Sequence, residues 1–138
     1  MTADQELVAW PQQPESWLAL GNLATLILDP VIDHFGPIQL TYAFAPPALT
    51  RHIARGIAPR LDQHASHELN LKGNPVCGRG GAAVDFRVPD VPASALVDWV
   101  MAETPVDRVY FYRDERAVHV SWAVKPLGRL LKVRGTMA

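Results

Sequence analysis

A chain of 138 residues has the length of one domain and is long enough to bury a single compact core. Apolar residues make up 49% and charged residues 20% of the sequence, ordinary values for a globular protein that exclude a disordered, collagen-like or coiled-coil chain. With 13 Lys and Arg against 14 Asp and Glu, and no basic stripe interleaved with aromatics, nucleic acid is not an expected partner. We therefore expect one domain over residues 1–138, with residues 1–13 loosely ordered.

The cysteine content and the first residues bear on the compartment. The single cysteine, Cys77, excludes an internal disulfide and a cysteine-rich structural zinc site. Residues 1–5 are polar and acidic, without the basic flank and apolar run of a signal peptide, and no uncharged stretch reaches the ~20 residues of a membrane span. We therefore expect a cytoplasmic protein with no membrane partner, whose oligomeric state does not follow from the sequence.

The first part of the chain predicts a long amphipathic helix followed by a strand. Apolar residues recur at three- and four-residue steps over 17–27, and Pro14 suits the first turn of a helix. Pro30 is expected to kink or restart this helix. Residues 38–42 then predict a strand, and residues 46–55 predict a second helix with prolines in its first turn.

The second part predicts a long loop and then most of a sheet. Residues 59–80 have weak periodicity and predict a loop with one helical turn, and loops of this length in compact domains tend to be functional. The elements that follow are a strand at 81–88, a short helix at 92–101, a β-hairpin of strands 106–113 and 117–122, and a last strand at 127–133. This order predicts an α+β fold with a mostly antiparallel sheet packed with helices.

Residues able to bind a metal lie at three places. His64 and His67 lie in the long loop, Asp85 on the strand after it and His119 on the hairpin. Two imidazoles and one carboxylate form a common catalytic zinc set, which leaves one coordination position open. A carboxylate among the apolar neighbours of Asp85 is costly without a cation or strong donors nearby. An ion pair with Arg87, on the same strand face, is the alternative partner.

Three short segments of the chain resemble the motifs of one enzyme family. Asp62-Gln63-His64, Gly81-Ala82-Ala83-Val84-Asp85 and Val118-His119-Val120-Ser121 look like the Ser-x-His, Gly-x-Ala-x-Asp and His-[Val/Ile]-Ser motifs of M15-type zinc peptidases. These are D-alanyl-D-alanine carboxypeptidases and phage endolysin peptidases. Residues 27–31 and 35–38 are also similar to the family's first helix and strand, so the resemblance covers most of the chain. It implies a fold of the Hedgehog/DD-peptidase type.

The resemblance also implies a zinc ion, held by His64 or His67 together with Asp85 and His119. Residues 65–80 lengthen the spacing between the first histidine and the glycine of the next motif far beyond the family's, so both loop histidines remain candidates. His64 is favoured by the Gln that precedes it. Thr41-Tyr42-Ala43-Phe44 stands where the family has Ser-Gly-Tyr-Arg, so the arginine that binds a substrate carboxylate is missing there.

The general base of the family is an acid shortly before the last histidine. Glu115 and Asp114 are the candidates here, and Glu115 is favoured because its extra methylene lets it reach back toward His119. Either acid reaches a metal-bound water only if the hairpin turn folds inward. The alternative is a turn whose charges are solvated.

Taken together, the residues and the resemblance predict a zinc-dependent peptidase-like hydrolase. Its expected partner is a peptide or peptidoglycan-like substrate, and the bond cleaved is a peptidoglycan-type or related amide. A chain without a signal peptide then suggests a phage-derived enzyme that is released by other means, or an intracellular substrate unrelated to the cell wall. The alternatives are a non-catalytic metal-binding module that keeps the peptidase fold, and a metal-free domain in which Asp85 pairs with Arg87.

Overall fold

The structure is a computed structural model that describes residues 10–45 and 63–133. The helix expected at 46–55 and the expected loose order of residues 1–9 fall outside these described residues. The elements in chain order are α1 (Pro14–Leu23), η2 (Ala24–Leu28), α2 (Asp29–Phe35), β1 (Gln39–Tyr42), η3 (Gln63–Ala65), β2 (Ala82–Arg87), α4 (Ala93–Glu103), β3 (Arg108–Phe111), β4 (Val118–Trp122) and β5 (Arg129–Lys132). The fold is thus α+β, and within the described residues the helices and strands follow the predicted order.

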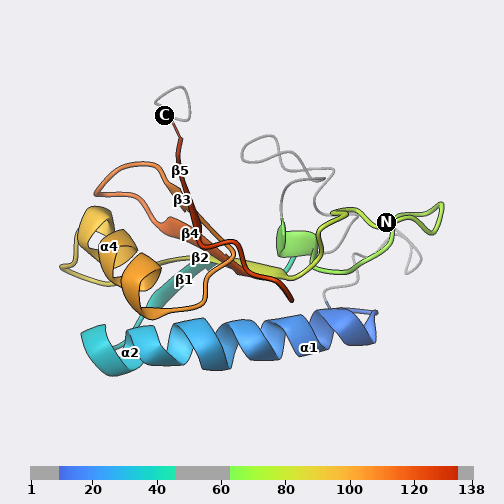
Figure 1. Ribbon diagram of the computed structural model, residues 1–138, viewed down its shortest axis with the longest axis horizontal. Coiled ribbons are helices and arrows are strands. Elements are labelled where there is room, and N and C mark those ends of the chain that lie inside the picture. The colour runs from blue at the N-terminus through green and yellow to red at the C-terminus, as the bar shows by residue number, and fades with distance from the viewer. Residues whose placement is uncertain (1–9, 46–62, 134–138) are drawn as a thin grey trace, which may run out of the picture.

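The first three elements form one continuous helix from Pro14 to Phe35 (Figure 1). The predicted interruption at Pro30 takes the form of the π-helical segment η2, in which the N–H of Asp29 donates to the carbonyl of Ala24. Pro30 has no N–H, and in a regular helix its ring would collide with the carbonyl of Leu26. A wider turn just before a proline relieves this crowding, so the helix continues through Pro30 instead of restarting.

The continuous helix has a second property that bears on the membrane prediction. It is 22 residues long, its most apolar 18-residue stretch has a mean hydropathy of 1.2, and it is the one helix in the described ranges that could cross a membrane by length and composition. Core helices of globular domains and N-terminal signal sequences meet the same criterion. In this fold its inner face packs against the sheet through Ala19, Leu23, Ile27 and Val31, each at most 1% exposed.

The five strands form one mixed sheet in the order β1-β2-β4-β3-β5. Three of the four neighbouring pairs are antiparallel, and only β3 and β5 run parallel. The predicted hairpin is confirmed, because β3 and β4 pair antiparallel with Val109 opposite Val120 and Tyr110 opposite His119. The register between β2 and β4 places Asp85 directly opposite His119.

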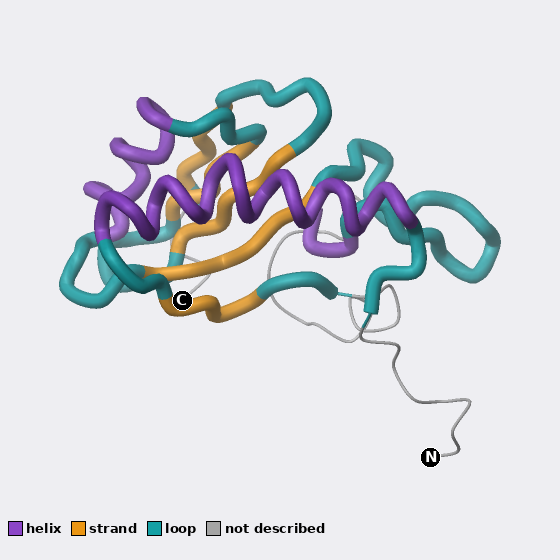
Figure 2. Tube along the Cα trace, turned by 90° about the horizontal axis from the view of Figure 1, so that it is seen from below, coloured by secondary structure: helices purple, strands orange, loops and turns teal. Residues whose placement is uncertain are grey.

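The two faces of the sheet differ in what covers them. The long helix and α4 both pack on one face, and seen from the helix side the long helix crosses in front of the strands (Figure 2). The strands contribute to this core Val84 and Phe86 from β2, Val109 from β3, and Val118 and Val120 from β4. Since side chains alternate along a strand, the residues between them point to the opposite face. Asp85, Tyr110 and His119 lie on that opposite face.

Candidate metal centre

Three of the residues singled out in the sequence meet on the face of the sheet away from the helices. The Nε2 atom of His64 and the Nδ1 atom of His119 each lie 3.0 Å from the same oxygen of Asp85, Oδ1. One potential ligand atom from each residue lies within 4.8 Å of the other two. Ligand atoms of a tetrahedral zinc site, each about 2.0–2.2 Å from the metal, are separated by roughly 3.3 Å. The group therefore has dimensions that suit a small metal cation.

Burial and aromatic contacts hold the two imidazoles in place. The side chains of His64 and His119 are 2% and 1% exposed, while that of Asp85 is 23% exposed, so solvent reaches the group past the carboxylate. The ring of Tyr42 lies 4.1 Å from that of His64 between centroids, and Tyr110 stacks on His119 at 4.6 Å. The two imidazoles are nearly perpendicular to each other, at 83°.

The proton arrangement of His64 follows from its neighbours. Its Nδ1 atom lies 2.8 Å from the carbonyl oxygen of Ala43, which can only accept, so Nδ1 carries a hydrogen and donates it. Its Nε2 atom faces the carboxylate of Asp85, which also only accepts when ionised. An imidazole between two acceptors needs either a second proton on Nε2 or a metal cation shared with the carboxylate. Metal-binding histidines commonly donate their other N–H to a backbone carbonyl in this way.

Asp85 is ionised in this setting. Burial acts to raise the pKa of Asp85, but hydrogen bonds from His119 and His64 and the positive charges of these rings outweigh burial and lower the pKa to about 2. The described residues show no ion pair between Asp85 and Arg87, the alternative partner weighed from the sequence. The carboxylate therefore has the two histidines as its partners.

His64 reaches Asp85 because the short helix η3 is tied to the residues that precede β2. Gln63 Nε2 donates to the carbonyl of Gly80 at 3.0 Å, and the Ser66 hydroxyl donates to the carbonyl of Gly81. The N–H of Gly81 in turn donates to Nε2 of His67 at 2.9 Å. The structure thus places His67 outside the cluster, where its ring nitrogen accepts a backbone hydrogen bond and holds the loop to the start of β2.

Both glycines in this joint are required by geometry. Gly80 and Gly81 have φ of +67° and +83°, in the region that side chains disfavour. A Cβ at Gly80 would lie 2.3 Å from the His67 ring, and one at Gly81 would lie 2.1 Å from the carbonyl oxygen of Trp122. The Gly-Gly pair therefore permits the close approach that brings η3 onto β2.

The two candidate bases lie away from the cluster. Asp114 accepts hydrogen bonds from the backbone of Ser94 through its side chain and from Ala93 through its carbonyl, at the start of α4. Because α4 covers the apolar face, Asp114 is held toward the opposite side of the sheet from His119. Glu115 is 65% exposed and pairs with Arg113 at 2.6 Å. The hairpin turn is thus the solvated turn that was the alternative, because its charges cap a helix and pair with one another.

Several residues around the cluster were not anticipated. Tyr42 and Tyr110 line the histidines, and Asp107, fully buried, binds the loop that carries His64. Tyr110 stands between the apolar residues Val109 and Phe111, and this alternation indicated that its side chain lies on the polar face. No local pattern marks Asp107, because its partners come from distant parts of the chain. Cys77 is buried at 1% exposure and lies outside the cluster.

Comparison of the chain with protein-family models, with curated proteins and with solved structures finds no match in any of the three.

Proposed function

We propose that the chain is a zinc-binding domain of the M15 peptidase type, with the Hedgehog/DD-peptidase fold, and that its metal centre hydrolyses amide bonds in a peptide or peptidoglycan-like substrate. The observation that carries the proposal is the position of His64 between two acceptors. Its Nδ1 donates to Ala43 while its Nε2 faces the ionised carboxylate of Asp85, an arrangement that a cation bound to both Nε2 and the carboxylate would satisfy. His119 completes the set through Nδ1.

The composition of the set supports a catalytic metal over a structural one. Structural zinc sites use four protein ligands, whereas catalytic sites use three and keep one position for water or substrate. Only three ligand residues gather among the described residues, and Asp85 is partly open to solvent. A bound zinc ion would lower the pKa of a coordinated water toward about 7 and polarise the substrate carbonyl.

The protein groups have distinct tasks in this proposal. The carbonyl of Ala43 fixes the tautomer of His64, and Tyr110 holds the plane of the His119 ring by stacking. Asp85 supplies the negative charge that offsets part of the cation's charge. The contacts of the two hairpin acids do not support either of them as the proton acceptor for hydrolysis, because Asp114 caps α4 and Glu115 pairs with Arg113 in solvent.

The position of those two acids favours a second candidate function. A domain that binds zinc through the same three residues but has no acid beside the metal would be a non-catalytic metal-binding module. Within residues 10–45 and 63–133, Asp85 is the only carboxylate in the cluster. Turnover separates the two candidates, since both predict metal binding.

The test begins with the metal content of the purified protein, measured by elemental analysis. The proposal expects about one equivalent of zinc, which is lost in His119→Ala and retained in His34→Ala. His34 is a suitable control because it is exposed and stacks on Trp99 far from the cluster. Protein that neither contains nor takes up zinc would contradict both candidates.

Activity is then measured on peptides that end in D-alanyl-D-alanine and on purified peptidoglycan fragments. Hydrolysis by the zinc-loaded wild type that disappears in His119→Ala supports the enzyme. Stoichiometric zinc without hydrolysis of either substrate supports the non-catalytic module.

A further inference from the structure

Asp107 joins four separate parts of the chain just before β3. Its side chain is completely buried, and its Oδ2 atom accepts from Nε of Arg79 at 2.6 Å and from Nε2 of Gln63 at 3.0 Å. Its Oδ1 atom accepts from Nη2 of Arg79 and from the N–H of Leu127. A buried carboxylate with this many donors is well satisfied and rigidly placed.

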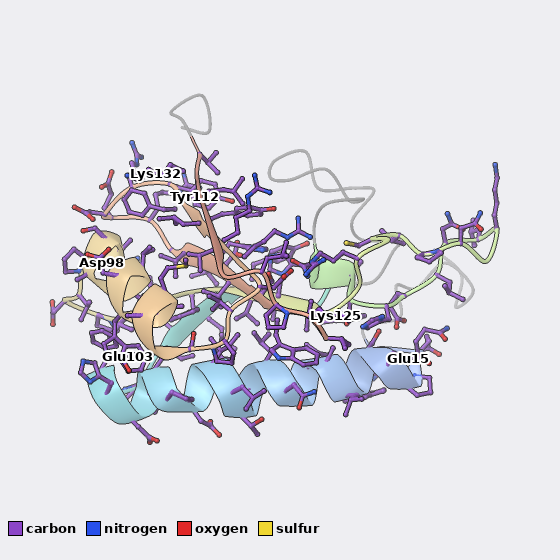
Figure 3. All side chains as sticks on the ribbon, in the orientation of Figure 1. Glu15, Asp98, Glu103, Tyr112, Lys125 and Lys132 are labelled. Atoms are coloured by element: carbon purple, nitrogen blue, oxygen red, sulfur yellow. The ribbon has the colours of Figure 1, made fainter. Side chains whose placement is uncertain are left out.

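The ion pair is itself anchored at its other end. Arg79 also donates through Nη2 to the carbonyl of Lys125 at 2.7 Å. Lys125, labelled in Figure 3, lies in the segment between β4 and β5. The side chain of Arg79 is 29% exposed, against 0% for Asp107. Hydrogen bonding to Asp107 raises the pKa of Arg79 further, and the donors around Asp107 lower the pKa of its carboxyl against the opposing effect of burial. Both groups are therefore charged under all ordinary conditions.

Gln63 links the rigidly placed carboxylate of Asp107 to η3 and so determines where η3 lies. Its Nε2 atom has two acceptors, Asp107 Oδ2 and the carbonyl of Gly80, each at 3.0 Å. The orientation of the amide is determined, because a flipped amide would place its oxygen against two groups that also only accept. Gln63 is 1% exposed and immediately precedes His64.

The backbone of His64 is thereby held on both sides. Gln63 holds it from the side of Asp107 and Gly80, and the carbonyl of His64 accepts the N–H of Ala45 at 2.9 Å. A displacement of η3 by a fraction of an ångström would move the ring between Ala43 and Asp85. Metal affinity is sensitive to displacements of this kind, since groups that orient ligands commonly change it 10- to 100-fold.

From these contacts we infer that Gln63 and Asp107 are positioning residues for the metal ligand His64, held through the ion pair between Asp107 and Arg79. This inference rests on the proposed metal centre and adds to it a support that touches neither the metal nor the substrate. It predicts that metal affinity depends on a hydrogen bond between Gln63 and Asp107, outside the ligand set.

The experiment measures the zinc dissociation constant by chelator competition, and the visible spectrum of the Co²⁺-loaded protein, in variants of the full chain. Gln63→Met keeps the volume and removes both donated hydrogen bonds. Gln63→Glu keeps the shape but places an oxygen against Asp107 and Gly80. Both should raise the zinc dissociation constant about 10-fold and change the Co²⁺ bands, which report ligand geometry.

A reversal of the pair tests for rescue. The double variant Gln63→Glu with Asp107→Asn restores a donor facing an acceptor between positions 63 and 107, while the oxygen at position 63 still faces the carbonyl of Gly80. Its zinc affinity should therefore recover in part, to a value between those of Gln63→Glu and wild type, as expected for two residues that interact directly. A merely structural role would lower the melting temperature in these variants and leave both the zinc affinity and the Co²⁺ spectrum of the folded protein unchanged.

The controls separate this inference from the proposed function. Asp114→Ala removes a cap of α4 on the other face of the sheet, so it lowers stability without changing the Co²⁺ bands. Wild-type protein that binds neither Zn²⁺ nor Co²⁺ overturns the metal centre and the inference with it. Wild type that binds zinc while the Gln63 variants bind it equally well, with an unchanged Co²⁺ spectrum, overturns the inference alone.

Discussion

The two faces of β2 and β4 are made from alternating residues of the same strands, yet they have opposite chemistry. Val84, Phe86 and Val120 point into a core that two helices close. Asp85 and His119, their neighbours in sequence, carry polar groups that hydrogen-bond to each other, with the His119 ring buried and Asp85 partly exposed. The apolar face gains stability from the removal of surface from water, whereas the polar face gains little from burial and needs partners for each group. Successive residues of these strands thus alternate between a face that stabilises the fold and a face that carries the polar cluster.

The largest expected effect concerns the polar face. Asp85→Ala should abolish zinc binding, a loss well beyond the roughly 100-fold that marks the upper range for supporting groups, because it removes the oxygen shared by both histidines. Equilibrium dialysis with zinc measures the effect. Undiminished zinc uptake by folded Asp85→Ala would remove this face from the metal site.

The adjacent residue on the apolar face should behave in the opposite way. Phe86 is fully buried, so Phe86→Ala is expected to lower the free energy of unfolding by about 3–5 kcal/mol through lost burial and a cavity. Denaturant unfolding measures the change. If Phe86→Ala remains folded, its zinc affinity should match wild type, and a large loss of affinity would show that the two faces are coupled.

A titration sharpens the comparison in metal-free protein. The pKa of Asp85 is about 2 in the folded state, against an ordinary value near 4, so its ionised form stabilises the fold above pH ~4. This contribution, about 2 kcal/mol, should be lost as the pH falls from ~4 through 2. Unfolding measured across this range should show a steeper decline in wild type than in Asp85→Asn. Parallel curves for the two proteins would contradict the assignment.

The smallest effect belongs to the hairpin turn. Asp114→Ala removes the side-chain hydrogen bond to the backbone of Ser94 and should lower the melting temperature slightly, because a helix N-terminal cap is lost. Thermal unfolding measures this loss. Amide hydrolysis, where present, should be unaffected, and a drop in turnover at unchanged stability would return Asp114 to the site.

Local patterns account for most of the fold. The three- and four-residue spacing from Trp17 to Ile27 predicted the helix, and the β-rich runs on either side of residues 113–116 predicted the hairpin. The behaviour of the helix at Pro30 did not follow, because a proline can be accommodated by a kink, a restart or a wider turn, and packing of Ile27 and Val31 on the sheet selects among them.

The candidate site also contains residues that local patterns identify and residues that only long-range contacts determine. Asp85 and His119 were both identifiable, since each is a polar residue at an alternate position of an apolar strand. The choice of His64 over His67 depends on the hydrogen bond from Gly81 to His67, a contact across the loop that no spacing reveals. Glu115 was favoured for its reach along the strand. In the structure it pairs with Arg113 and Asp114 caps α4, so neither acid points toward His119.

The contacts of residues 63–67 with Gly80 and Gly81 close the segment between His64 and Asp85 into a loop. Because residues 63–67 are fastened directly to residues 80–81, the chain leaves and returns at nearly the same place, and its tip forms a small turn of its own. There the N–H of Asn70 donates to Asn74 and Leu71 is 91% exposed. Extra residues in such a turn add little closure entropy, roughly 0.6 kcal/mol for each doubling of length. Position 72–73 is therefore a suitable insertion point for an epitope, a fluorophore or a second domain, without change to the residues of the proposed metal centre.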